Sequence, residues 1–249
     1  MIDQVLFMMR SFRIENVFHT SCLDLCRWVP DDTVDLIIID PPYLLTDETW
    51  DNIEVITDEF VQELFRIAKS SCSLYCWCGI GENSQSLIRW FPLFSKIWKF
   101  KDLITWKKQR GIGMRKGWLY TREEIMWFVK DNKRFIWNKE FQYSNEKRAF
   151  TLSNNLSEFR RLSNVWTNIK EINQSIAKNT EAAIHPAQKP LKAIERIILA
   201  HTKENDIVFD CFVGSGTTAI AAKKLKRQFI CGDISERYVN FTIAKLKEF

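Results

Sequence analysis

Short apolar runs alternate with amphipathic stretches along this chain. Compact apolar runs bounded by polar or turn residues are typical of buried strands, and they occur at 36–39, 73–78, 104–106, 207–209 and 228–232. Apolar positions three or four apart are typical of helices, and they occur at 56–68, at 220–225 and from 191 onward, directly after Pro190. Tyr238, Phe241 and Leu246 continue one face of a last helix, and we interpret these three residues as core. The alternation predicts an α/β fold with a mostly parallel sheet and helices on both faces.

The tetrapeptide Asp40-Pro41-Pro42-Tyr43 directly follows the first of these apolar runs. Ligands of open α/β sheets bind at the carboxyl ends of strands. A carboxylate and a backbone carbonyl there can accept both hydrogens of the exocyclic amine of a nucleobase, while a tyrosine ring stacks on the base. Proline has no N–H to pair in the sheet, which leaves neighbouring carbonyls for a ligand. A plain strand followed by a turn is the alternative interpretation.

A second motif runs from Asp210 to Thr218, between an apolar run and a helical pattern. Gly214 and Gly216 would let the backbone approach a ligand closely, and the following helix N-terminus presents free N–H groups. Asp233 ends the next strand pattern about 20 residues later, where a carboxylate can accept both ribose hydroxyls of an adenosine-containing cofactor. An ordinary strand-to-helix turn is the alternative.

Together the two motifs resemble the amino-methyltransferases, which transfer a methyl group from S-adenosylmethionine to adenine N6 or cytosine N4 of DNA. The order of the motifs, with Asp40 first and the glycine motif last, resembles the permuted β class. Further similarities lie between them, at Trp50-Asp51, Ala68-Lys69, Ser73-Leu74-Tyr75, Ile104 to Lys107, Glu124-Ile125, Val165-Trp166 and His185 to Pro190. The likeness covers nearly the whole chain and is nearest to the short adenine-specific enzymes of type II restriction-modification systems. It implies a Rossmann-like methyltransferase fold with circularly permuted motif order and a small target-recognition insertion.

The resemblance also implies a role for each motif residue. The implied catalytic residues are Asp40, Pro41, Pro42 and Tyr43. The implied cofactor-binding residues are Asp210, Phe212, Gly214, Ser215, Gly216, Thr217, Thr218, Asp233, His185 and Lys189. In the family, His185 to Pro190 would border the methionine end of the cofactor, so Lys189 is a candidate for its carboxylate. A loop cation in solvent is the alternative for Lys189.

Two positions depart from the family pattern. Cys211 stands where proline is usual, and His19-Thr20-Ser21 stands where the family has an aspartate. The missing aspartate affects one polar contact near the cofactor adenine, and Asp24 is a candidate replacement that no spacing argument secures.

Length and composition predict a single catalytic domain over 1–249. Hydrophobic residues at 46% and charged residues at 27% are globular proportions. Seven cysteines without a secretory leader predict free thiols in a reduced, cytoplasmic setting. Cys72, Cys76 and Cys78 lack zinc-site spacing, and the chain has only three histidines, so no metal is expected. No apolar run reaches the roughly 18 residues that a membrane span needs.

Positive charge is concentrated between residues 107 and 148, where twelve Lys or Arg stand against five acids. Aromatic residues alternate with this charge, which is typical of a surface that neutralises phosphates and stacks on bases; they are Trp118, Tyr120, Trp127, Phe135 and Trp137. The residues expected to bind DNA are Lys107, Lys108, Arg110, Arg115, Lys116, Lys133 and Arg134. A solvated basic surface is the alternative.

The stretch from Gln109 to Trp118 contains three glycines. We expect a mobile loop that closes over DNA, with an ordered hairpin as the alternative. We interpret 107–183 as the approximate target-recognition and DNA-contact region.

The sequence therefore predicts a site-specific, S-adenosylmethionine-dependent methyltransferase that acts on adenine N6 of a flipped base in double-stranded DNA. Adenine rests on resemblance alone, because Asp at the position of Asp40 is usual for N6 enzymes and Ser is common in N4 enzymes. Cytosine N4, RNA adenine and a silent nucleic-acid-binding partner subunit stay open as alternatives. The class also implies a companion restriction endonuclease and a homodimer.

Overall fold

The structure is a computed structural model of the 249-residue chain. It describes residues 15–43, 54–81, 84–112, 116, 118–147, 159–171 and 188–248. The strands are β1 (Glu15–His19), β2 (Val34–Ile39), β3 (Ala68–Cys78), β4 (Lys99–Ile112), β5 (Tyr120–Val129), β6 (Tyr143–Lys147), β7 (Phe159–Arg161), β8 (Val165–Trp166), β9 (Ile207–Asp210) and β10 (Gln228–Asp233). The helices are α2 (Cys22–Trp28), α3 (Asp58–Ile67), α4 (Ser86–Ser95), α6 (Leu191–His201), α7 (Thr217–Lys224) and α8 (Glu236–Leu246), with a 3₁₀ turn η2 (Lys139–Gln142).

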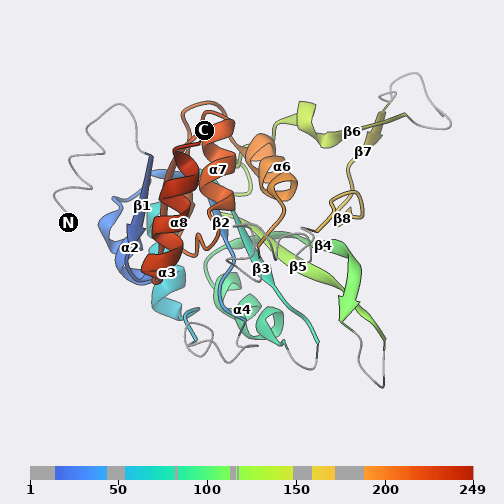
Figure 1. Ribbon diagram of the computed structural model, residues 1–249, viewed down its shortest axis with the longest axis horizontal. Coiled ribbons are helices and arrows are strands. Elements are labelled where there is room, and N and C mark those ends of the chain that lie inside the picture. The colour runs from blue at the N-terminus through green and yellow to red at the C-terminus, as the bar shows by residue number, and fades with distance from the viewer. Residues whose placement is uncertain are drawn as a thin grey trace.

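One eight-stranded sheet organises the described part of the chain, in the order β1-β10-β9-β2-β3-β5-β4-β8. Figure 1 shows β1 at one end of this sheet and β8 at the other. Five of its seven pairings are parallel, and only the two made by β5 are antiparallel. The predicted mostly parallel sheet is confirmed. A separate two-stranded sheet pairs β6 with β7.

Helices cover both faces of this sheet, as predicted. Neighbouring residues of β2 point to opposite faces, so its apolar run serves two cores. Ile37 and Ile39 pack with buried residues of α2, α3 and α4. Leu36 and Ile38 pack with buried residues of α6 and α7.

Capping and packing explain where two helices differ from their predicted extents. The Thr57 hydroxyl accepts a hydrogen bond from the Phe60 N–H, so α3 begins at Asp58 and Ile56 is buried just before it. In α8 the buried positions are Val239, Thr242 and Leu246. Of the three core positions predicted there, Leu246 is buried, whereas Tyr238 and Phe241 are half-buried. The core prediction for those two residues was therefore wrong.

The predicted glycine-rich loop is partly strand. Residues 109–112 belong to β4, and Ile112 pairs with Tyr120 of β5. Because Cys78 pairs with Glu124, this end of the β4–β5 hairpin continues beyond the carboxyl end of β3. The ordered hairpin therefore describes residues 109–112 better than a mobile loop does, and 113–115 and 117 lie outside the described residues.

The sheet has a topological switch point between β9 and β2. The connection through α3 takes the chain from β2 to β3 on one side, and the connection through α7 takes it from β9 to β10 on the other. Parallel strands whose connections diverge leave a crevice at their carboxyl ends. Asp40 follows β2 and Asp210 ends β9, so both carboxylates lie at that crevice.

Candidate active site

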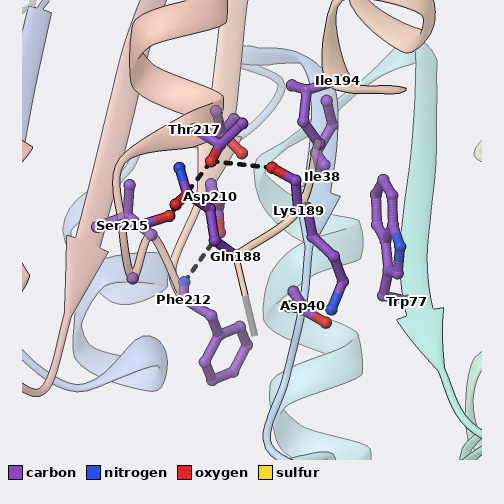
Figure 2. A pocket seen from close by; sticks show the side chains of 13 residues that line it. Ile38, Asp40, Trp77, Gln188, Lys189, Ile194, Asp210, Phe212, Ser215 and Thr217 are labelled. Carbon is purple, nitrogen blue, oxygen red and sulfur yellow. Dashed lines mark hydrogen bonds and ion pairs between the residues drawn. The ribbon is translucent and has the colours of Figure 1, made fainter. Parts of the chain in front are cut away.

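The two sequence motifs line the same cavity at the switch point. Asp40, Asp210 and residues 212–215 border it together with Lys189, and Ile38 and Trp77 form its sheet side (Figure 2). Pairing of Leu36 with Val208 and of Ile37 with Phe209 sets the register that brings the two motifs together. Motifs about 170 positions apart in the sequence thus form one site.

The turn after β2 holds the Asp40 carboxylate in a defined orientation. The Tyr43 hydroxyl donates a 2.9 Å hydrogen bond to Asp40 Oδ1. The Tyr43 ring contacts Trp90 edge-on, with centroids 6.0 Å apart, and packs against both cores. Pro41 is buried and supplies no N–H that would need a partner there. Burial raises the pKa of Asp40, while the Lys189 ammonium opposes that rise.

The glycine turn after β9 is held by the carboxylate of Asp233. Asp233 Oδ2 accepts from the Gly214 N–H, and Oδ1 accepts from the Ser235 N–H, both at 2.9 Å. Gly214 and Gly216 have φ of 48° and 83°, which favours glycine at both positions. At Gly216 a Cβ would also lie 2.7 Å from Thr242 Oγ1. Both requirements explain the Gly-x-Gly spacing.

Asp210 lies beneath this turn and accepts a 3.0 Å hydrogen bond from the Phe212 N–H. Burial raises its pKa to about 7, against hydrogen bonds from Thr218 and Phe212 that lower it. The Phe212 ring packs edge-on against Phe60 of α3, at 5.9 Å between centroids.

The chemistry of the turn fits an adenosine-containing, zwitterionic cofactor. Carboxylates that already orient the backbone lie beside hydroxyls at the start of α7, from Ser215, Thr217 and Thr218. These groups supply acceptors for ribose hydroxyls and donors for a carboxylate. The individual cofactor contacts stay predictions, and His185 lies outside the described residues.

Lys189 occupies the centre of the site. Its ammonium lies 2.7 Å from Asp40 Oδ2 and 3.2 Å from Glu123 Oε2, and its carbonyl accepts a 3.3 Å hydrogen bond from the Thr217 hydroxyl. The side chain is only 9% exposed. Burial lowers the pKa of Lys189, but the two carboxylates outweigh burial and raise it above its ordinary value. The ammonium in this structure therefore contacts the catalytic motif.

Glu123 is a site residue that the sequence reasoning missed. The sequence shows it only as one acid in a basic region, whereas in the structure it is 14% exposed and pairs with both Lys108 and Lys189. Burial raises its pKa, but the two ammonium groups outweigh burial and hold that pKa below its ordinary value. Two consecutive acids within a strand next to the catalytic strands are the signal that could have revealed it. Its neighbour Glu124 is 2% exposed and accepts a 2.7 Å hydrogen bond from Thr105.

The predicted DNA-contact residues do not share one surface. Lys107 and Lys116 are exposed on the β4–β5 hairpin, beyond the carboxyl edge of the sheet. Lys108 points to Glu123. Nothing is described of the Arg110 side chain, and Arg115 lies outside the described residues.

Lys133 and Arg134 lie at the opposite edge of the sheet. They follow Val129, which pairs with Ser73 at the middle of β3, and the adjacent Lys130 donates to the Ala68 carbonyl at the start of that strand. The predicted basic surface is therefore divided, because the two ends of β5 lie at opposite edges of the sheet.

The aromatic residues of the same region also divide. Trp118 is 94% exposed on the hairpin. Trp127 instead stacks on Tyr75 and Trp137 at 5.7 and 5.5 Å between centroids and contacts Phe135 edge-on, so these rings pack against one another. The three rings are half-buried and line a cavity of about 540 Å³, so base stacking on Trp127, Phe135 and Trp137 stays a prediction.

The two departures from the family pattern have structural roles. Cys211 is buried next to Cys26, and burial raises the pKa of its thiol well above its ordinary value. Ser21 accepts from the Asp24 N–H as the N-cap of α2, and Asp24 in turn pairs with Arg27 at the surface. All seven cysteines are free. The described residues contain no cluster of three metal-ligand side chains and no helix long and apolar enough to cross a membrane.

The fold and site together define an α/β enzyme with two motifs at one switch-point cavity. A family model for DNA methylases of the N6/N4 type matches residues 34–245, so the chain belongs to this family and is a DNA methyltransferase. The resemblance to amino-methyltransferases is confirmed.

Individual relatives and solved structures agree with this assignment. The type II methyltransferase M1.MboII of Moraxella bovis is 31% identical over 91% of this chain and 94% of its own length. The DNA adenine methyltransferase YhdJ of Escherichia coli (strain K12) is 27% identical over 93% and 82%. The M1.HpyAVI–SAM complex has a TM-score of 0.63 at 23% identity, covering 92% of this chain and 98% of that chain. The cytosine-N4-specific PvuII DNA methyltransferase has a TM-score of 0.67 at 18% identity, covering 92% and 84%. Both structural similarities support the methyltransferase fold.

Proposed function

We propose that this chain is a site-specific methyltransferase that modifies adenine N6 in double-stranded DNA, with S-adenosylmethionine as methyl donor. The observation that carries the proposal is the cavity that Asp40 and the glycine turn line together. One side offers acceptors for an exocyclic amine, and the other offers the carboxylates, hydroxyls and backbone N–H groups that suit the cofactor.

The protein's own residues act on the target amine by orientation. A base in the duplex must leave the stack to reach a half-buried carboxylate such as Asp40. The Asp40 carboxylate and the Pro41 carbonyl accept the two amine hydrogens, and the Tyr43 ring stacks on the base. These hydrogen bonds localise the nitrogen lone pair, which is otherwise delocalised into the ring. When bound, S-adenosylmethionine would supply an electrophilic methyl group and leave as a neutral thioether. The proton that the methylated amine loses passes to Asp40 or water, so no strong base is needed.

The hairpin of β4 and β5 is the part best placed to contact DNA. Lys107, Lys116 and Trp118 are exposed on it, at the edge of the sheet where Asp40 lies. Cations there neutralise phosphates, and an exposed indole can stack on a base. The wider target-recognition region over 107–183, the single domain over 1–249, the companion endonuclease, the homodimer and the cytoplasmic location remain predictions.

Adenine is supported by the aspartate at the first motif position and by the relative named as an adenine methyltransferase. The family model covers both N6 and N4 chemistry, and one structural neighbour is named as cytosine-N4-specific. The product must therefore be identified directly.

Incubation with S-adenosylmethionine and unmethylated genomic DNA, followed by nucleoside mass spectrometry and sequencing, tests the proposal. We expect N6-methyladenine at one recurrent sequence. N4-methylcytosine would replace the base assignment, and preferential methylation of matched RNA would replace the DNA assignment. Asp40→Ala should abolish methylation while calorimetry still detects cofactor binding; retained turnover would exclude the role of Asp40. If the unmutated protein does not bind the cofactor, a catalytically silent nucleic-acid-binding subunit would be the favoured function.

A further inference from the structure

The Lys189 ammonium is held between two carboxylates from different elements. Asp40 Oδ2, after β2, lies 2.7 Å away, and Glu123 Oε2, on β5, lies 3.2 Å away. The ammonium also lies 5.4 Å from the centroid of the Tyr43 ring. Figure 2 shows the lysine side chain running along the cavity and ending at Asp40. The cation thus contacts both the carboxylate and the ring that the proposed function assigns to the target base.

The Glu123 carboxylate has unused acceptor capacity. Oε1 pairs with Lys108, whereas Oε2 is buried and lies 3.2 Å from the Lys189 ammonium. This contact is longer than the 2.7 Å between the ammonium and Asp40, so a small movement of the ammonium toward Oε2 would strengthen the weaker of its two ion pairs.

Little free space lies beside Asp40 while Lys189 stays in place. The cavity that Asp40 and Lys189 line has a volume of about 30 Å³. That is room for about two water molecules, whereas ligand pockets are typically ~300–1,000 Å³, so side chains must move before ligands enter. The Lys189 side chain, which ends 2.7 Å from Asp40 Oδ2, is one that must move for a base amine to take its place beside that oxygen.

We propose that Lys189 occupies the amine-acceptor position of Asp40 in the free protein, and that the target amine displaces the lysine toward Glu123. This inference rests on the proposed function, since Lys189 is the group that the target base of that function must replace. Both occupants present N–H donors to the same carboxylate oxygen. A base with an exocyclic oxygen at that position would instead place an acceptor against a carboxylate, so the exchange favours bases with an exocyclic amine.

In the free protein, Lys189 also stabilises the negative charges of the Asp40 and Glu123 carboxylates. Two mostly buried carboxylates near each other repel unless a cation lies between them, and one of them otherwise takes up a proton. The ionisable groups that face Asp40 come from every neighbouring element: they are Lys189, Tyr43, Glu123 on β5 with its partner Lys108 on β4, Asp210 on β9, and Cys76 and Cys78 on β3. Lys189 and Tyr43 are the two that favour ionised Asp40.

The variant Lys189→Met tests this arrangement, because it removes the charge and keeps most of the side-chain length and the backbone carbonyl that Thr217 contacts. We expect the carboxyl titration of Asp40, followed by ¹³C NMR in the free protein, to move up by about 1–3 pH units. The acidic limb of the pH profile of methylation should move in the same direction. At pH values above this limb, the KM of the variant for DNA should be about threefold or more below that of the unmutated protein, because no lysine has to be displaced from Asp40.

Two companion variants sharpen the result. Glu123→Gln combined with Lys189→Met removes the second negative charge, so the Asp40 titration should return part of the way toward the unmutated value. Lys192→Met removes an exposed lysine of α6 and should change neither the titration nor KM.

An unshifted Asp40 titration in Lys189→Met would overturn the inference even if methylation proceeds. A rise in both KM for DNA and the cofactor Kd would also overturn it, because Lys189 would then act as a cofactor ligand. If the unmutated protein produces no methylated base but the NMR shift is present, the proposed function fails while the Lys189–Asp40 contact stands.

Discussion

The Tyr43 hydroxyl donates a hydrogen bond to Oδ1 of Asp40, three residues before it, and leaves Oδ2 directed at the Lys189 ammonium. One tyrosine therefore has two separable functions in the candidate site. Its hydroxyl orients the carboxylate, and its ring provides a surface on which a base can stack.

Substitution of Tyr43 should separate these functions. Tyr43→Phe keeps the ring and loses one hydrogen bond, so we expect the single-turnover rate of methylation to fall about three- to tenfold. Tyr43→Ala also loses base stacking, typically ~1–3 kcal/mol, so a further fall of about fivefold or more is expected. Equal rates for the two variants would show that the ring does not stack on the base.

Replacement of Asp233 should weaken cofactor binding. Its carboxylate accepts from Gly214 and Ser235, and in Asp233→Asn an amide N–H would face one of these donors. We expect the Kd for S-adenosylmethionine, measured by calorimetry, to rise about tenfold or more.

Asp24→Asn is the matched control, since Asp24 is exposed and pairs with Arg27 on α2. It should leave the Kd unchanged. A comparable loss in both variants would mean that Asp24 supplies the carboxylate missing from the segment before the catalytic motif.

Two lysines of the basic region should differ in their effect on DNA binding. Lys107→Ala removes a cation at the edge of the sheet where Asp40 lies, whereas Lys133→Ala removes one at the opposite edge. We expect Lys107→Ala to reduce the slope of log affinity against log salt by about 0.9, the value for one lost phosphate contact. Lys133→Ala should match the unmutated protein in a fluorescence-anisotropy salt titration, and an equal loss of slope would require DNA to reach both edges.

His201 should make stability depend on pH. Its ring is fully buried, with Nδ1 2.7 Å from the Ile136 carbonyl and Nε2 2.7 Å from the Tyr75 hydroxyl. Burial lowers its pKa from 6.5 to about 4. The unfolded chain therefore binds a proton that the folded protein does not between these values, and stability falls as pH drops from 6.5 to 4, by up to about 3 kcal/mol.

His201→Gln removes this titration. The difference in melting temperature between the unmutated protein and the variant should be largest at pH 7.5 and shrink toward pH 5. Taking the difference cancels the contribution of buried acids such as Asp210. The raised pKa of Asp210 makes stability increase as pH falls, which is opposite to the effect of His201. A constant difference across this range would show that His201 titrates normally.

The local pattern of apolar and turn residues was sufficient to predict the sheet type, the helices on both faces and the two motifs, because the periodicity of buried positions and the turn residues can be recognised within short stretches of sequence. Asp40 and Asp210 could be located in advance at carboxyl ends of strands, since each directly follows or ends an apolar run.

Contacts between distant strands depend on register and direction, which the sequence alone did not reveal. The antiparallel course of β5 brings Glu123 to the site and takes Lys133 and Arg134 to the other edge, although all three belong to one basic region of the sequence. The ammonium of Lys189 meets Asp40 only because α6 packs on the face of the sheet behind β2. Tertiary structure decided these partners, because charge and burial act through space between residues that are far apart in the sequence, such as Asp40 and Lys189.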